Sequence, residues 1–147
     1  MLGIVYVLLA ILLAVDENWS RRIDWVACML SPFGALSRFF LSRQLNKRLR
    51  HGAFPLGTFL ANVLGSLAMA LVFYGTENSS SLTTGWNNVA IEAFQVGFLG
   101  SLTTMSTFVS EVVDNRDRHS PLASYIYLVA TAIAAQAPVL IMGATLK

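Results

Sequence analysis

Long apolar stretches separated by short polar ones make up most of this chain. Crossing a hydrocarbon core takes roughly 20 helical residues, and four stretches approach or exceed that length. We expect helices over residues 24–42, 55–75, 88–113 and 121–145. The connections are short, without a low-complexity segment or an interdomain linker. The pattern predicts one all-α unit over residues 24–145.

A shorter apolar segment, MLGIVYVLLAILLAV, occupies residues 1–15. It is short for a spanning helix, and two interpretations are open. One is the core of a secretory signal, and the other is a transmembrane helix that is marginal or truncated at its N-terminus. A basic n-region is missing and AVDEN is a poor cleavage site, which favours the second interpretation.

Composition indicates a membrane protein. Hydrophobic residues make up 55% of the chain and charged residues 12%, with a mean hydropathy of +0.61. A soluble domain has about a quarter of its residues charged, so we expect an integral, multi-pass membrane protein. The single cysteine, Cys28, excludes an intramolecular disulfide and a cysteine-based zinc site.

The basic residues predict the orientation of the helices. They gather in the first and third connections between the long helices, as Arg43, Lys47, Arg48 and Arg50, then Arg116 and Arg118. The intervening connection, TENSSSLTTGWNN, has neither Lys nor Arg and contains the sequon Asn78-Ser79-Ser80. Both basic connections are therefore expected in the cytoplasm, with Lys147 outside. Arg21 and Arg22 would also lie outside, which opposes this orientation. The net charge of +2 indicates topology and not a nucleic-acid partner.

Polar residues within the second long helix follow one face. Thr58, Asn62 and Ser66 are spaced four apart, so they line up along the helix. Beside them runs a ridge of small residues, Gly57, Ala61 and Gly65, which lets another helix approach closely. Asn62 is as well explained by hydrogen bonding between helices as by contact with a ligand.

The third long segment carries GFLGSLTTMSTF over residues 97–108. Glycine costs about 1 kcal/mol in a helix, and hydroxyl groups compete for the backbone. We therefore predict that this helix is broken around TTMST, residues 103–107. Free backbone groups at membrane depth must face protein, ions or water, and broken helices often build ion sites.

The fourth long helix carries a weaker polar stripe. Tyr127 and Thr131 share a face, with Ala135 where a third polar residue could stand. Tyr125 is nearly as good a candidate for the inward tyrosine, and Gln136 is a further buried polar candidate. Simple helix packing explains this pattern at least as well as a site does.

Few charged residues lie where they could take part in catalysis or ion binding. Arg38 alone lies well inside a helix, and we interpret it as a structural anchor. Glu92 and Glu111 lie near the ends of the third segment, where we expect them to mark the interfaces. No nucleophile, metal-ligand set or phosphate loop can be assembled, so we do not expect an enzyme.

Three motifs, FGALSRFFLSRQL, FPLGTFLANVLGS and VGFLGSLTTMSTF, resemble the CrcB-like fluoride channel family in order and spacing. They are most similar to the second half of the two-repeat fluoride exporters of fungi, and the match covers all four long helices. The resemblance implies a four-helix transmembrane repeat, with segment 1–15 as a linker helix. It also implies passive, selective fluoride export in a lipid bilayer, expected to be the plasma membrane. The pore would be formed with a second, inverted repeat or a homodimer partner.

The resemblance also assigns residues. The implied fluoride path consists of Asn62, Ser106, Thr107, Phe108, Tyr127 and Thr131. A structural Na⁺ would be held by the backbone carbonyls of Gly100 and Thr103, and Arg38 matches the arginine of the family's first helix. The chain departs from the family at Met105, where a phenylalanine is usual, and at Ala135, where a hydroxyl is usual.

Several alternatives are open, the first from segment 1–15 and the second from Met105 and Ala135. The chain is half of a tandem protein, a truncated version of one, or a free-standing half with a separate partner. Its own pore conducts, or it serves as a non-conducting scaffold for a pore elsewhere. A small multidrug-type exporter is a third alternative, but it would require a glutamate in mid-helix.

Overall fold

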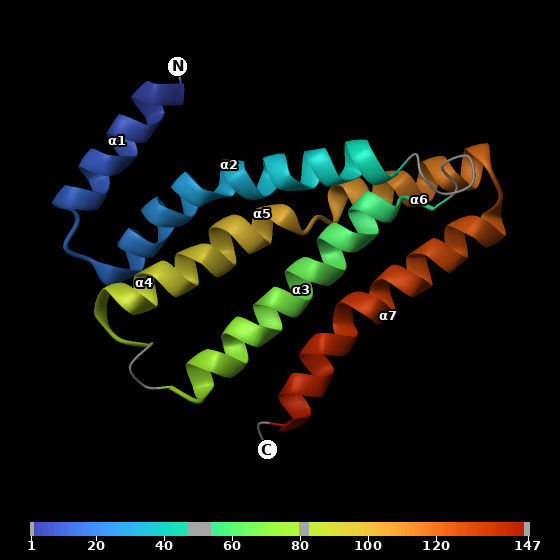
Figure 1. The fold of residues 1–147 in the computed structure, drawn as a ribbon. Helices are drawn as coiled ribbons and strands as arrows, with labels where there is room; N and C mark the ends of the chain where they lie inside the picture. The colour runs from blue at the N-terminus through green and yellow to red at the C-terminus, as the bar shows by residue number, and fades with distance from the viewer. Residues whose placement is uncertain (1, 47–53, 80–82, 146–147) are drawn as a thin grey trace.

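The computed structural model describes residues 2–46, 54–79 and 83–145, and all of the regular elements in these ranges are helical (Figure 1). The elements, in order, are α1 (Leu2–Val15), α2 (Trp19–Leu45), α3 (Leu56–Glu77), α4 (Gly85–Ala93), the π-helix η3 (Phe94–Leu99), α5 (Gly100–Leu102), α6 (Ser106–Arg118) and α7 (Pro121–Thr145). The predicted all-α fold is confirmed.

Four spans are long and apolar enough to cross a membrane: α2, α3, the run from α4 through α6, and α7. Large apolar side chains on their outer surfaces point away from the protein, as Phe39 (53% exposed) and Leu140 (69% exposed) do. Such a surface is stable in lipid, where apolar side chains need no protein neighbours. The segment at the N-terminus forms a helix too, but at 14 residues it is shorter than the four spans.

The first span begins five residues before the predicted start at 24, because Asn18 caps it. The Asn18 Oδ1 accepts a hydrogen bond from the Ser20 amide at 3.0 Å, which satisfies one of the amides that a helix start leaves unpaired. The cap draws Arg21 and Arg22 into the first turns of α2.

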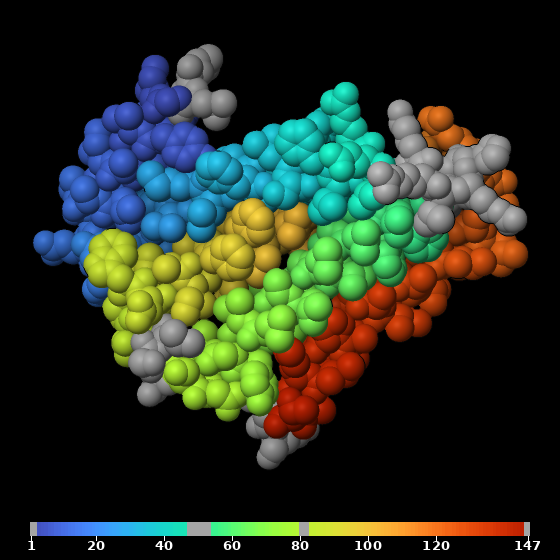
Figure 2. All heavy atoms as spheres, viewed as in Figure 1, coloured from blue at the N-terminus to red at the C-terminus, as the bar shows by residue number. Residues whose placement is uncertain are grey.

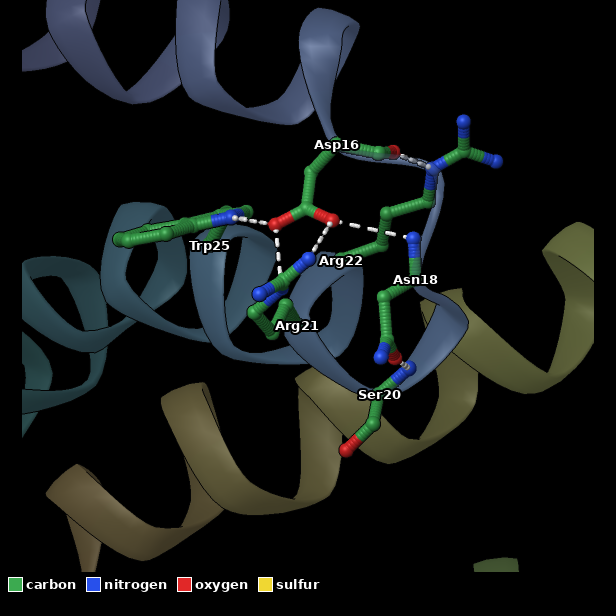
Figure 3. A network of polar contacts seen from close by, with 6 residues as sticks. All are labelled: Asp16, Asn18, Ser20, Arg21, Arg22 and Trp25. Atoms are coloured by element: carbon green, nitrogen blue, oxygen red, sulfur yellow. Dashed lines mark hydrogen bonds and ion pairs between the residues drawn. The ribbon is translucent and has the colours of Figure 1, made fainter.

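Asp16 organises the corner between α1 and α2 (Figure 3). Its carboxylate accepts hydrogen bonds from the Asn18 amide (3.0 Å) and the Trp25 indole (3.3 Å), and it forms an ion pair with Arg21 (2.7 Å). Arg22 donates to the Asp16 carbonyl (2.6 Å). The Asn18 amide, more than any other contact, holds the pKa of Asp16 below its ordinary value.

Arg22 also joins this corner to α4. Its guanidinium carbon lies 4.9 Å from the ring centroid of Trp19 and 5.1 Å from that of Trp86, within the range of a cation–π contact. The two rings meet edge to face at 5.7 Å. The arginines that opposed the predicted orientation therefore both have partners within the protein.

Glycines let α2 pack directly on the third span. A Cβ built on Gly97 would overlap the carbonyl oxygen of Ala27, and one on Gly34 would overlap that of Phe98. On the other side, Gly57 lets the start of α3 cross α2 at Leu41. Such close backbone contact is what the predicted small-residue ridge permits.

The α7 helix packs along α3 and α6, at the edge of the helical layer (Figures 1 and 2). The end of α2, the start of α3, the end of α6 and the start of α7 lie together at one end of the molecule. Arg43, Arg116 and Arg118 lie in the last turns of α2 and α6 at this end. Lys47, Arg48, Arg50, Ser80 and Lys147 lie outside the described residues. Which side of the membrane this end faces stays a prediction.

Candidate functional site

The third span is broken where the sequence predicted. The α5 helix ends at Leu102, Thr103 adopts an extended conformation (φ −72°, ψ 149°), and α6 begins at Ser106. The span is also irregular before the break, because η3 widens it to a π-helix over Phe94–Leu99. Short π-helical segments are often found at functional sites.

The Asn62 side chain hydrogen-bonds to the non-helical backbone at the break. Its Oδ1 accepts a hydrogen bond from the Thr104 amide at 2.8 Å, and its Nδ2 donates to the Thr104 carbonyl at 3.3 Å. Asn62 is only 8% exposed. These bonds replace the helical partners that Thr104 lacks, so at least part of this amide serves to bind one helix to another.

Arg38 spans the break from the opposite side. Its Nε donates to the Ser101 carbonyl (3.3 Å) and its Nη1 to the Thr107 hydroxyl (2.7 Å). One guanidinium thus connects the last turn of α5 to the first turn of α6. This agrees with the interpretation of Arg38 as a structural anchor, although its partner is the break and not the membrane interface.

The break also exposes backbone carbonyls. In a continuous helix the amides of Thr104 and Thr107 would bond to the carbonyls of Gly100 and Thr103. Instead the Thr104 amide bonds to Asn62 and the Thr107 amide to the Thr104 hydroxyl (3.4 Å). Within the described ranges no backbone amide bonds to either carbonyl, and Gly100 accepts only a long bond from the Thr103 hydroxyl (3.4 Å). Free carbonyl oxygens are ligands suited to a hard cation such as Na⁺.

A groove of about 410 Å³ opens beside the break, between α3, the broken span and α7. Its lining residues are Asn62, Ser66, Gly100, Thr103, Thr104, Met105, Phe108, Thr131, Ala132, Ala135 and Gln136. The predicted stripe on α3 and the predicted stripe on α7 therefore face each other across one space. The start of α6, which carries the positive end of a helix dipole, lies at the same groove.

Glu111 closes one end of this arrangement. Its Oε1 accepts hydrogen bonds from the Thr58 hydroxyl (2.7 Å) and the Asn46 amide (2.9 Å), and its Oε2 accepts one from the Tyr127 hydroxyl (2.8 Å). That Glu111 marks a membrane interface stays a prediction, and the structure adds that its carboxylate faces protein groups. Its position three residues after Phe108 was a signal that it shares that face of α6.

The aromatic residues pack around Tyr127. The Phe108 ring lies 5.2 Å from the Tyr127 ring, and Phe54 meets Tyr127 edge to face at 5.1 Å. Tyr127 is fully buried, whereas Tyr125 is 69% exposed. Of the two candidate tyrosines, Tyr127 is the inward one.

The structure brings most of the predicted site residues together, but not all of them. Asn62, Phe108 and Thr131 line the groove along with Gly100 and Thr103. Tyr127 lies next to the groove, through its contact with Phe108. Thr107 is turned toward Arg38, and Ser106 is exposed with its hydroxyl 3.4 Å from that of Thr104.

Two predicted hydroxyls donate their protons within the protein. Tyr127 donates to Glu111, and Thr131 donates to the Tyr127 carbonyl at 2.7 Å. Each would have to rotate away from that partner to face an anion. Within the described residues, no group of three or more His, Cys, Asp or Glu side chains could hold a metal ion.

The fold and the groove together define a class: a multi-pass, all-α membrane protein with polar groups gathered at a broken helix. A family model described as "CrcB-like protein, Camphor Resistance (CrcB)" matches residues 25–144. The chain belongs to this family.

Relatives of the chain include proteins named for fluoride. It is 42% identical over 119 residues to fluoride export protein 1 of Candida albicans, covering 76% of this chain and 30% of that protein. It is 37% identical over 111 residues to fluoride export protein 1 of Neurospora crassa, covering 76% of this chain and 20% of that protein. The fluoride-specific ion channel FluC 2 of Bacillus thuringiensis subsp. konkukian is 37% identical over 101 residues, covering 69% of this chain and 77% of that protein. The chain thus spans less than a third of these fungal relatives.

Proposed function

We propose that this protein is a fluoride channel, or one half of such a channel, that exports fluoride passively across the plasma membrane. The observation that carries the proposal is the groove in which Asn62, Phe108 and Thr131 meet beside the break. The choice of fluoride as the ion comes from the names of the relatives, and the groups in the groove are chemically suited to that ion.

Fluoride is small and holds its water tightly, so a pore must replace that water with closely placed donors. One N–H of Asn62 is donated to Thr104, which leaves the second for an anion. The positive edge of the Phe108 ring and the hydroxyls of Thr131 and Tyr127 add further contacts. Ser106 and Thr107, in the first turn of α6, would receive the ion where the helix dipole is positive.

The proposed path runs along α3 and α7 through successive levels of side chains. Four residues of helix rise about 6 Å, so Thr58, Asn62 and Ser66 on α3 form three levels. Tyr127, Thr131 and Ala135 form matching levels on α7. Glu111 lies at the first level, where its three hydrogen-bond donors hold it, and we propose that this level is the cytoplasmic end.

We further propose that the groove becomes a closed pore only with a second, inverted repeat or a homodimer partner. The groove is open along the chain described here, and Met105 at its margin is 73% exposed. Na⁺ held by the carbonyls of Gly100 and Thr103 would supply a fixed positive charge at the break.

A second candidate is a scaffold half that does not itself conduct. Met105 favours it, because a thioether lacks the positive edge of an aromatic ring. This candidate predicts that the chain assembles with a homologous repeat, yet that its own Asn62 and Thr131 can be replaced without loss of fluoride flux.

The test is fluoride efflux from liposomes that contain the assembled channel, followed with a fluoride electrode. We expect Asn62→Ala to slow efflux at least tenfold, since hydrogen bonds to ions contribute about 1.5–3 kcal/mol. The matched control is Asn78→Ala, because Asn78 lies at the far end of α3 and, among the described residues, its side chain bonds to the Tyr74 carbonyl alone. Equal efflux from wild type and Asn62→Ala would contradict the assignment of Asn62.

A further inference from the structure

The groove contains polar groups whose hydrogen-bonding capacity is not used within the chain. Ser66 and Gln136 both line it. Within the described residues neither side chain makes a hydrogen bond, whereas Tyr127 and Thr131 donate to partners in the protein. Ser66 is half-buried, and Gln136, which the sequence suggested as a buried polar candidate, is exposed. A polar group at membrane depth is costly without a partner, so these two donors are expected to serve something that enters the groove.

Their positions place them at one level. Ser66 lies one turn beyond Asn62 on α3, about 6 Å further along the helix axis. Gln136 lies beside Ala135, one turn beyond Thr131 on α7. The short Ala135 side chain provides no donor at this level, and the longer Gln136 side chain lines the same groove from the neighbouring helical position.

We infer that Gln136, together with Ser66, forms a further anion-binding level of the groove and supplies the donor that Ala135 lacks. The ligand is a small anion that accepts hydrogen bonds from an amide and a hydroxyl. This inference rests on the proposed fluoride function. It adds a specificity-determining residue that the stripe of hydroxyls does not contain.

A second glutamine in the chain provides a matched control. Gln95 lines a different groove of about 590 Å³, whose other lining residues are Met69, Ala70, Phe73, Val96, Gly100, Val139, Met142 and Gly143. The Gln95 side chain likewise makes no hydrogen bond within the described residues. Replacing it tests whether loss of any membrane-embedded amide impairs the channel, because its surroundings are apolar.

The experiment compares Gln136→Leu, Gln136→Asn, Ser66→Ala and Gln95→Leu with wild type. Each assembled channel is checked by size-exclusion chromatography and then assayed for fluoride efflux from liposomes. We expect Gln136→Leu to slow efflux roughly tenfold to a hundredfold. Gln136→Asn should be intermediate, Ser66→Ala slower than wild type, and Gln95→Leu unchanged.

Efflux from Gln136→Leu within twofold of wild type would overturn the inference and leave the proposed function intact. Equal slowing by Gln95→Leu would overturn it too, by showing a general effect of losing an amide. If Gln136→Leu does not assemble, Ser66→Ala and Gln136→Asn decide, and wild-type efflux from both overturns the inference. Wild-type liposomes that retain fluoride would instead refute the proposed function, and this inference with it.

Discussion

The side chain of Asn62 holds the backbone of Thr104 at both its amide (2.8 Å) and its carbonyl (3.3 Å). The sequence left two roles open for this residue, bonding between helices and contact with a ligand. The two bonds to Thr104 establish the first role. The remaining N–H of the amide keeps the second role possible, so one residue can both shape the break and face the groove.

Asn62→Ala is expected to destabilise the break as well as slow fluoride efflux. It leaves two backbone groups of Thr104 unpaired, which costs about 1–3 kcal/mol for a buried group. Hydrogen exchange in detergent should be faster for the amide of Thr104 than in wild type. Unchanged exchange there would contradict the clamp, and the amides of α1 serve as the internal reference.

Arg38→Lys is expected to loosen the break, because a lysine cannot place two donors in the fixed fork of a guanidinium. The bonds at stake run to the Ser101 carbonyl and the Thr107 hydroxyl. We expect a lower melting temperature than wild type for Arg38→Lys, and likewise for Arg38→Gln. Arg43→Lys, in the last turn of α2, is the matched control, and an equal effect there would argue against the brace.

Gly97→Ala should disrupt packing between α2 and the third span. The added Cβ would overlap the Ala27 carbonyl oxygen, and overpacking of this kind costs about 1–3 kcal/mol or more. The matched control is Gly143→Ala on α7, where a Cβ meets nothing within 4 Å. Thermal unfolding in detergent measures both, and a Gly97→Ala protein as stable as Gly143→Ala would contradict the close contact.

The corner at Asp16 should respond to acid. Its pKa is lowered from the ordinary value of 3.8, first by the Asn18 amide, so the ionised form stabilises the fold. That contribution is present above the ordinary value and is lost as pH falls through the lowered pKa. The melting temperature of wild type should exceed that of Asp16→Asn at pH 7, and the difference should shrink as the pH falls through the lowered pKa of Asp16. A difference that does not change with pH would show that the charge is not involved.

Much of the fold followed from the sequence because lipid imposes simple rules. The four spans were predictable because a long apolar segment in a membrane forms a helix that crosses it. The break at TTMST was predictable because clustered hydroxyls compete for the helical backbone. The start of α2 at Trp19 depends on the Asn18 cap, and the charged residues Arg21, Arg22 and Asp24 that follow the cap interrupt the apolar pattern. The π-helix at Phe94–Leu99 was not predictable from the apolar pattern, which does not distinguish it from an α-helix.

The site was predicted less completely than the fold. The four-residue spacing placed Asn62 and Thr131 each on a polar face of its own helix. Only the packing of α3 against α7 shows that these two faces meet at one groove. The partners of Glu111 were not predictable, because position along a helix does not reveal that Thr58 and Tyr127 converge on it from two other helices. Contacts between distant segments require the folded chain.

The deciding measurement is the ratio of fluoride to chloride release from liposomes that carry the wild-type channel with its cognate repeat. A path with closely placed donors around Asn62 and Phe108 should let trapped fluoride leave the liposomes, while chloride, which is larger, stays inside. Comparable release of the two anions, or vesicles that retain fluoride, would contradict a fluoride path beside the broken helix.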